Sequence, residues 1–275
     1  MNLMYITKCP EIAIIAEDAG VDWIFVDMEF IGKDCRQGGL DTVQNHHTVE
    51  DVANIKATVK KAKVLVRVNP IHETLMDYPS SEDEIEAVIK AGADIVMLPF
   101  FKTVGEVKRF IKILAGRAKA CLLLETPEAA SLLEKIVEVP GIDMIHIGLN
   151  DMHLALKMKF MFQLLSDGLV DKWTSIISKK GIPYGFGGLA SLDGGAVPGR
   201  MILKEHYRVG SQMVILSRAF CNTDDIKDME NVHNIFVSGV AAIREEESEM
   251  KAMSQEDFIN NHKAVCNAVD KIVNK

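Results

Sequence analysis

The feature that most constrains this chain is a regular alternation of short aliphatic runs with longer amphipathic runs. Each aliphatic run has the length of a buried β-strand, and the amphipathic runs have helical periodicity. The predicted strands are LMYIT (3–7), DWIFVDM (22–28), KVLVRV (63–68), DIVMLP (94–99), ACLLLE (120–125), DMIHIG (143–148), PYGFG (183–187) and QMVILS (212–217). Strands that are nearly all apolar and separated by helices form a parallel sheet covered by helices.

The predicted helices fill the spaces between these strands, and several begin with capping residues. Thr48 with Asp51 and Thr103 with Glu106 resemble capping boxes, and Thr126 precedes a proline, as an N-cap often does. Helices are predicted at about 10–19, 48–62, 81–91, 103–115, 127–138, 151–179 in two pieces, and 198–209.

The number and length of these units favour one architecture. Eight strand–helix units over about 220 residues match a (β/α)₈ TIM barrel in size. A doubly wound open sheet is the alternative, but the turn after the first predicted strand, ITKCPE, lacks the glycines common in such sheets. We therefore expect residues 1–222 to form the barrel. We expect residues 223–275 to form a helical extension of one or two helices that packs either on a neighbouring subunit or on its own barrel.

Composition excludes several classes of protein. The formal net charge is −8, and no basic stripe with interleaved aromatic residues occurs, so nucleic acid is not an expected partner. No apolar run reaches the ~18 residues of a membrane span. The N-terminus lacks a signal-peptide layout. The 5 cysteines are odd in number and scattered, which disfavours a disulfide framework or a CxxC metal site. A reduced, cytoplasmic protein is expected.

Charged residues stand where the predicted strands end, and in a barrel those ends build the active site. Glu125 follows the fifth strand and Asp151 follows the sixth, so both carboxylates can hold one divalent ion. Oxygen-only ligation suits Mg²⁺ or Mn²⁺. Arg67, at the end of the third strand, offers a planar fork for a substrate carboxylate or a developing oxyanion. Together these residues would bind a 2-oxo acid and hold its enolate.

Each of these residues also has a purely structural interpretation. Asp151 stands where it could cap the next helix, and Arg67 could pair with Asp27 or Glu29 across adjacent strands. Glu125 is harder to explain in this way, because Thr126 already serves as the cap.

Further candidates lie in the predicted loops at the same end of the barrel. His46 and His47 precede the Thr48 cap, and one of them could move a proton near neutral pH. Gly187 and Gly188 belong to a GFGG stretch that lets backbone approach a ligand, although a tight turn explains such glycines as well. Gly148 and Asn150, at the end of the sixth strand, complete the candidate substrate contacts. His146 is expected in the barrel core.

Several stretches are similar to one known family. AEDAGVDWIFVDMEF, VLVRVNP, AGADIVMLPF, LLLETPEAA and VPGIDMIHIGLNDMHLAL cover most of residues 10–156. They resemble the HpcH/HpaI aldolase and citrate lyase family of class II, metal-dependent aldolases. The resemblance implies a TIM barrel, commonly assembled into hexamers with C-terminal helices exchanged between neighbours. It also implies a metal held by Glu125 and Asp151, with Arg67 contacting a pyruvate-like enolate.

The sequence departs from the family pattern after the second strand. The usual motif there resembles D-x-E-H, whereas this chain has Asp27, Met28, Glu29 and Phe30, so the expected catalytic histidine is absent. The following loop could supply a substitute in His46 or His47.

The function predicted from these observations is that of a metal-dependent carbon–carbon lyase. It would cleave or form a bond alpha to a 2-oxo acid, with an aldehyde as the second substrate and Mg²⁺ or Mn²⁺ as cofactor. A homo-oligomer, trimer or hexamer, is expected. The alternatives are a related enzyme acting on phosphoenolpyruvate or an acyl thioester, and a non-catalytic barrel that serves binding or assembly.

Overall fold

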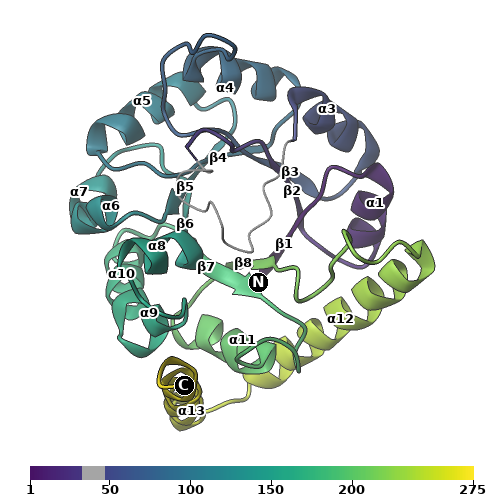
Figure 1. Cartoon of the computed structure of the whole chain (residues 1–275), viewed down its shortest axis with the longest axis vertical. Coiled ribbons are helices and arrows are strands. Elements are labelled where there is room, and N and C mark those ends of the chain that lie inside the picture. Colours follow the sequence, from purple (N-terminus) through teal and green to yellow (C-terminus); the bar gives the residue numbers. More distant parts are fainter. Residues whose placement is uncertain (33–46) are drawn as a thin grey trace.

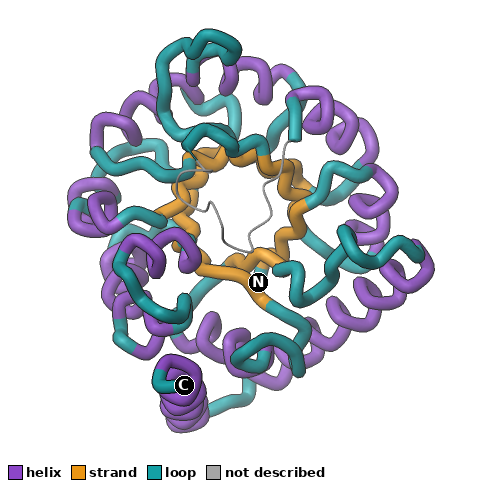
Figure 2. Tube along the Cα trace, viewed as in Figure 1, coloured by secondary structure: helices purple, strands orange, loops and turns teal. Residues whose placement is uncertain are grey.

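The structure, a computed structural model, describes residues 1–32 and 47–275. Within these residues, eight parallel strands close into a barrel in the order β1 to β8, enclosed by helices (Figures 1 and 2). The strands are β1 (Asn2–Ile6), β2 (Trp23–Asp27), β3 (Lys63–Arg67), β4 (Ile95–Leu98), β5 (Lys119–Leu124), β6 (Met144–Ile147), β7 (Tyr184–Leu189) and β8 (Met213–Leu216). The predicted TIM barrel is confirmed, with all its strands.

Alternate residues of each strand point into the barrel, since successive side chains in a strand face opposite sides. The inward set fills the barrel with buried apolar side chains: Met4, Trp23, Phe25, Leu65, Ile95, Met97, Cys121, Leu123, Met144 and Met213. The outward set packs against the helices in a second, larger core. Asp27 is the register partner of Arg67 at the end of β2 and β3, so both polar side chains lie above the apolar filling.

The helices around the barrel follow the predicted order and several of the predicted caps. They are α1 (Pro10–Asp18), α3 (Val49–Thr58), α4 (Ser81–Lys90), α5 (Val104–Leu114), α6 (Pro127–Ser131), α7 (Leu133–Ile136), α8 (Leu149–Ala155), α9 (Gln163–Ser166), α10 (Leu169–Ser178) and α11 (Gly199–Arg208). Thr48 and Thr103 form the predicted capping boxes, and the Thr126 hydroxyl accepts from the Ala129 N–H. These caps satisfy N–H groups that have no partner inside their helix.

The predicted helix boundaries are wrong in three places. The helix predicted at 127–138 consists of two short helices, α6 and α7, which meet at Leu132. The region 151–179 holds three helices in place of two, and the first begins earlier, at Leu149. The chain turns at Lys157 and Gly168, whose φ angles of 56° and 73° are left-handed and cannot continue a right-handed helix. The predicted helix 48–62 ends at Thr58, because Val59 adopts an extended conformation.

The C-terminal extension forms two helices, α12 (Met229–Met250) and α13 (Gln255–Val273). Within this single chain α12 packs against α1, and α13 packs against α11 and α9 (Figure 1). The buried Glu205 carboxylate of α11 contacts two residues of α13. Its Oε2 lies 2.8 Å from His262 Nδ1, and its Oε1 accepts a hydrogen bond from Asn261 Nδ2 at 3.0 Å. Packing on a neighbouring subunit stays a prediction. Among the described residues, each helix is too short or too polar to cross a bilayer.

Candidate active site

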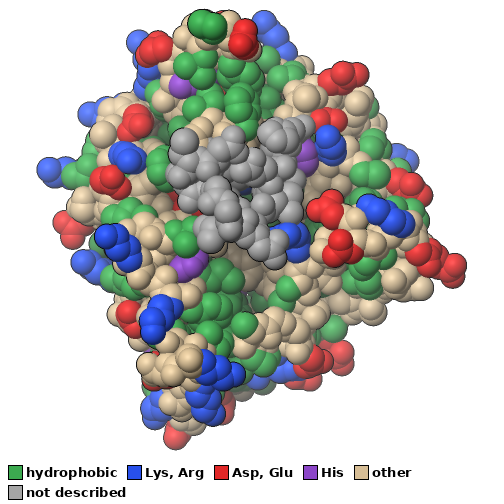
Figure 3. All heavy atoms as spheres, viewed as in Figure 1, with side chains coloured by type: hydrophobic (Ala, Val, Ile, Leu, Met, Phe, Trp, Pro, Cys, Tyr) green, Lys and Arg blue, Asp and Glu red, His purple; other side chains and the backbone are tan. Residues whose placement is uncertain are grey.

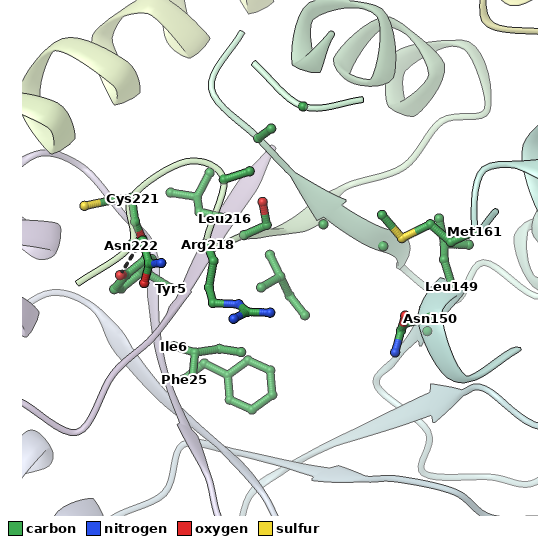
Figure 4. Close-up of a pocket in the computed structure, with 18 of the residues that line it drawn as sticks. Tyr5, Ile6, Phe25, Leu149, Asn150, Met161, Leu216, Arg218, Cys221 and Asn222 are labelled. Atoms are coloured by element: carbon green, nitrogen blue, oxygen red, sulfur yellow. Dashed lines mark hydrogen bonds between the residues drawn. The ribbon is translucent and has the colours of Figure 1, made fainter. Parts of the chain in front are cut away.

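A cavity of about 950 Å³ opens at the carboxyl ends of the strands. This volume lies near the top of the range of ~300–1,000 Å³ that is usual for ligand sites. The predicted site residues that line it are Arg67, Glu125, Asp151, His47, Gly148, Asn150, Gly187 and Gly188. The barrel therefore brings together residues that lie far apart in the sequence, and Figure 4 shows part of this lining.

Arg67 is fixed by two acids from the neighbouring strand end. Its Nε and Nη2 donate to the two oxygens of Asp27 at 2.7 and 2.8 Å, and Nη1 lies 3.4 Å from Glu29 Oε2. Its Cζ lies 5.6 Å from the centre of the Phe25 ring. Burial disfavours the charge, but the two acids outweigh it and raise the pKa of Arg67 well above its usual value.

Arg67 therefore does pair with Asp27 and Glu29, as the structural interpretation proposed. This pairing is compatible with a position in the site. The side chain is 16% exposed and lines the cavity. A guanidinium has five N–H groups, and the two acids occupy three of them. Asp27 thus orients a cation whose other N–H groups can bind a substrate anion.

Glu125 is a carboxylate held in a nearly closed environment at the end of β5. It is 4% exposed, and its Oε1 accepts the Phe100 N–H at 2.9 Å. Burial first, and then the nearby charges of Glu29 and Asp151, raise the pKa of Glu125 well above its usual value. A carboxylate in this environment gains most from a bound cation.

Gly148 gives Glu125 its space. A Cβ at position 148 would lie 2.8 Å from Glu125 Cβ and 2.9 Å from Glu125 Oε2, too close for either atom. The carboxylate therefore rests against bare backbone, and this explains the glycine by a physical contact.

Asp151 does not cap its helix. Helix α8 begins at Leu149 with Gly148 as N-cap, and Asp151 is its third residue. The side chain is 9% exposed and lines the cavity, with Asn150 Nδ2 3.4 Å from its Oδ1. The capping alternative is therefore wrong, and Asp151 faces the same cavity as Glu125.

The donor set at Glu125 and Asp151 fits a hard divalent cation. Among residues 1–32 and 47–275, no group of three or more His, Cys, Asp or Glu side chains has the arrangement of a metal site. Mg²⁺ commonly takes one or two carboxylates and keeps several waters. Two buried carboxylates at a cavity wide enough for water and substrate meet that requirement.

The two predicted histidines have different outcomes. His46 lies outside the described residues. His47 lines the cavity, and its Nδ1 accepts the Asp27 N–H at 3.0 Å. The neutral ring therefore carries its proton on Nε2. This hydrogen bond ties His47 to the residue that orients Arg67.

Phe30, at the position where the family pattern has histidine, does not line the cavity. Its ring packs edge-on against Tyr78, with 4.8 Å between centroids. The Phe30 and Ile31 N–H groups both donate to Asn69 Oδ1 at 2.9 Å. The backbone after β2 is therefore fixed by Asn69, but it presents no imidazole there.

The glycines within β7 are largely explained by close packing. A Cβ at Gly185 would lie 2.0 Å from the Met213 carbonyl oxygen, and one at Gly187 would lie 2.7 Å from Leu149 Cδ1. The Gly187 carbonyl accepts from His146 Nε2 at 3.1 Å. Gly187 and Gly188 lie on the cavity wall, and their contact with substrate stays a prediction.

Two features of the site were not predicted. His146 is buried as expected, yet it lines the cavity, and among the described residues its Nδ1 has no hydrogen-bond partner. Asn69 Nδ2 donates a hydrogen bond to the Glu84 carboxylate of α4, which also accepts one from the Tyr78 hydroxyl. A histidine inside an otherwise apolar strand was the sequence signal that could have indicated the position of His146. No sequence pattern indicated the hydrogen bond between Asn69 and Glu84.

Figure 3 shows the surface on one face of the molecule. Lys and Arg side chains are mixed with Asp and Glu around its periphery, and no continuous basic stretch is visible among the described residues of this face. The absence of a nucleic-acid partner stays a prediction.

The sequence matches the family model described as HpcH/HpaI aldolase/citrate lyase over residues 3–161. A search of curated protein sequences gives no match. The structure is also similar to solved structures, some of which are described as members of that family.

Three of these solved structures illustrate the similarity. A HpcH/HpaI aldolase/citrate lyase family protein from Burkholderia cenocepacia J2315 is 14% identical, with TM-score 0.59 over 78% of this chain and 87% of that one. The HpcH/HpaI aldolase from Desulfitobacterium hafniense DCB-2 is 16% identical, with TM-score 0.59 over 89% and 93%. The citrate synthase SbnG is 16% identical, with TM-score 0.57 over 90% and 94%. At these identities the likeness shows the fold. Because the family model spans more than half of the chain, this protein belongs to the HpcH/HpaI aldolase/citrate lyase family.

Proposed function

We propose that this protein is a metal-dependent carbon–carbon lyase that forms or cleaves a bond alpha to a 2-oxo acid. The observation that carries the proposal is the convergence of Glu125, Asp151 and Arg67 on one cavity. Two acids offer a cation site, and beside them an arginine with available N–H groups offers an anion site. A 2-oxo acid presents both a carbonyl oxygen for the first and a carboxylate for the second.

Mg²⁺ or Mn²⁺ is the proposed cofactor, held by Glu125 and Asp151. Members of this family typically depend on a divalent metal ion. When bound, such an ion supplies a Lewis acid for the 2-oxo carbonyl. Arg67, oriented by Asp27, holds the carboxylate and stabilises negative charge as the enolate develops.

The reaction needs one proton to leave and one to arrive. In the synthetic direction a proton leaves the carbon next to the donor carbonyl, that carbon bonds to the aldehyde carbon, and the aldehyde oxygen takes up a proton. Cleavage is the reverse, and neither direction needs an oxidant. His47 is the proposed proton-transfer residue, because it lines the cavity beside Asp27. Its Nδ1 is the nitrogen that takes up the donor proton, and the hydrogen bond from the Asp27 N–H must open for that step. His46 remains the alternative.

The remaining partners follow from the same proposal. The substrates are a small 2-oxo acid and an aldehyde, and the protein acts as a homo-oligomer. Its proposed location is the cytoplasm, supported by the free thiols of Cys9, Cys121, Cys221 and Cys266 among the described residues.

Product analysis tests this function. The protein, Mg²⁺ or Mn²⁺, pyruvate and propanal are expected to give a 4-hydroxy-2-oxo acid, detected by NMR and mass spectrometry. Asp151→Asn should abolish the product, whereas Asp167→Asn, at an exposed acid in the turn after α9, should not. Replacing His46 and His47 singly identifies the proton-transfer residue, and undiminished product formation in both variants would exclude them.

Three other results would replace the proposal. Release of phosphate from phosphoenolpyruvate, or of free thiol from an acyl thioester, without any aldol product would favour the related enzymes. Absence of metal binding would favour the non-catalytic barrel.

A further inference from the structure

Away from the cavity, α11 and α13 bring an acid, an imidazole and a thiol into one line of contacts. Glu205 Oε2 of α11 lies 2.8 Å from His262 Nδ1, and His262 Nε2 lies 3.6 Å from Cys266 Sγ. His262 and Cys266 stand four residues apart on α13, so they share one face of that helix. Helix α13 packs against α11 on the outside of the barrel (Figure 1). These three side chains therefore form a cluster separate from the cavity wall.

Glu205 is held firmly at the buried end of this cluster. Its side chain is 0% exposed, and Arg208 Nε donates to its Oε2 at 2.8 Å. Asn261 Nδ2 donates to its Oε1 at 3.0 Å. Because an ionised carboxylate can only accept hydrogen bonds, the proton of the neutral His262 ring lies on Nδ1, which donates to Glu205.

The His262 ring then offers a base to the thiol. With the proton on Nδ1, Nε2 has a free lone pair, and it accepts the hydrogen bond from the Cys266 S–H group at 3.6 Å. Acid, imidazole and nucleophile stand in this order in enzymes with an activated cysteine. There the imidazole takes the proton as the sulfur attacks, and the acid stabilises the imidazolium. The cluster on α11 and α13 has the parts for the same proton transfer.

The thiol depends on this base for its reactivity. Burial first, and then the charges of Glu205 and Asp270, raise the pKa of the Cys266 thiol, while Arg208 acts in the opposite direction. The thiol is therefore neutral near pH 7, whereas the thiolate is the form that attacks. Removal of its proton by the imidazole supplies that form, and a thiolate of high pKa is intrinsically a strong nucleophile.

The reacting end of the cluster lies at the surface. Cys266 is half-buried and the His262 side chain is 27% exposed, whereas Glu205 is enclosed. A small reagent can therefore reach the sulfur, while water has no access to the carboxylate that orients the ring. By contrast, the thiols of Cys121 and Cys221 are buried.

We propose that Cys266 is a redox modification site, at which His262 and Glu205 activate the thiol toward a small disulfide. The Cys266 proton moves to His262 Nε2 as Sγ bonds to one sulfur of the disulfide. The S–S bond of the disulfide breaks, and the leaving thiolate takes the proton from His262. The Cys266 sulfur is oxidised to a mixed disulfide and the leaving sulfur is reduced to a thiol. This inference does not depend on the proposed function, since it needs neither a metal nor a 2-oxo acid.

The rate of mixed-disulfide formation tests the proposal. The reduced protein is treated with 2-hydroxyethyl disulfide, a small neutral disulfide, near neutral pH, and mass spectrometry of its peptides follows Cys266 and Cys9 separately. Cys266 should react about tenfold faster than N-acetylcysteine in the same solution, because general-base catalysis outweighs partial burial. A half-buried thiol without a base would react more slowly than N-acetylcysteine. A rate at Cys266 no higher than that of N-acetylcysteine would overturn the proposal.

His262→Asn separates activation by the base from simple exposure. The asparagine amide can still donate to Glu205, but the variant has no ring nitrogen to accept the Cys266 proton. The rate at Cys266 should fall about tenfold or more, whereas the rate at Cys9 should stay within about twofold and so report an intact fold. His233→Gln, at an exposed histidine of α12, is the matched control and should leave both rates unchanged.

The two measurements decide the proposal together. Equal rates at Cys266 in the wild type and in His262→Asn would show that exposure alone sets the reactivity, and the proposal would fail. If His262→Asn does not fold, the comparison of the wild type with N-acetylcysteine still decides it, because that comparison needs no variant.

Discussion

At the scale of single residues, the close contact between Gly148 and Glu125 determines where the Glu125 carboxylate can lie. A methyl group at position 148 would press on Glu125 Cβ and Oε2. Gly148→Ala is therefore expected to weaken Mn²⁺ binding about tenfold, or about 1.4 kcal/mol. Isothermal titration calorimetry measures this, with Gly105→Ala as control because its nearest neighbour would be Thr103 Oγ1 at an ordinary 3.7 Å. Equal Mn²⁺ affinity in both variants would contradict the account.

His146 makes stability depend on pH. Burial, with a contribution from Arg67, lowers its pKa from 6.5 to about 4. The unfolded chain binds a proton more readily than the folded chain between these values. The stabilisation is therefore complete above pH 6.5 and is lost as pH falls through about 4, by about 3 kcal/mol in all.

Urea unfolding of His146→Leu measures this effect. Between pH 7 and pH 4 the variant should lose less stability than the wild type, whereas His233→Gln, at an exposed histidine, should follow the wild type. His206 is also buried and has a lowered pKa, so it adds to the loss of stability at low pH in all three proteins. A wild-type pH dependence in His146→Leu would show that His146 is not the group responsible.

The sequence predicts the position of a residue well when that position follows from its own strand. It predicts contacts poorly when they depend on other parts of the fold. The positions of Glu125, Asp151 and Arg67 follow from the strand ends, so they could be predicted. The hydrogen bonds of Arg67 with Asp27 required the register of β2 against β3, which left its structural pairing an open alternative. The Nδ1 atom of His146 has no hydrogen-bond partner among the described residues, and this depends on neighbours that only the folded barrel supplies.

At the scale of elements, Asn69 links the ends of β2 and β3 to α4. Its Oδ1 accepts from Phe30 and Ile31, and its Nδ2 donates to Glu84 at 2.8 Å. Asn69→Ala removes all of these hydrogen bonds and leaves buried polar groups without a partner, which costs about 3 kcal/mol. Urea unfolding measures the loss of stability. Asn54→Ala, on the exposed face of α3, should change it by less than about 0.5 kcal/mol. Similar values for the two variants would refute the link.

The order of elements could be predicted better than their ends. Aliphatic runs and capping residues are local signals, and all the predicted strands and the caps at Thr48, Thr103 and Thr126 are confirmed. The breaks after α8 and before α10 occur at residues with left-handed backbone conformation. One of them is Lys157, and lysine is not a residue type from which this conformation can be predicted.

At the scale of the whole molecule, the outer helices carry apolar side chains that this single chain leaves exposed. Ile259 of α13 is among the large apolar residues on the surface. The predicted trimer or hexamer should therefore be seen by sedimentation, and Ile259→Asp should shift it toward the monomer. Asn260→Asp adds the same charge at the next exposed position and should not. A monomeric wild type at micromolar concentration would contradict the predicted assembly.

We propose that the barrel as a whole places a cation site and an anion site in one cavity, and that enolate formation is the chemistry these two sites serve. The most direct measurement is exchange of the pyruvate methyl protons with D₂O by NMR. The account predicts exchange by the wild type that requires Mg²⁺ or Mn²⁺. It predicts loss of exchange in Glu125→Gln and retention in Glu128→Gln, at an exposed acid paired with Lys102. Undiminished exchange in Glu125→Gln, or none in the wild type with either metal, would contradict it.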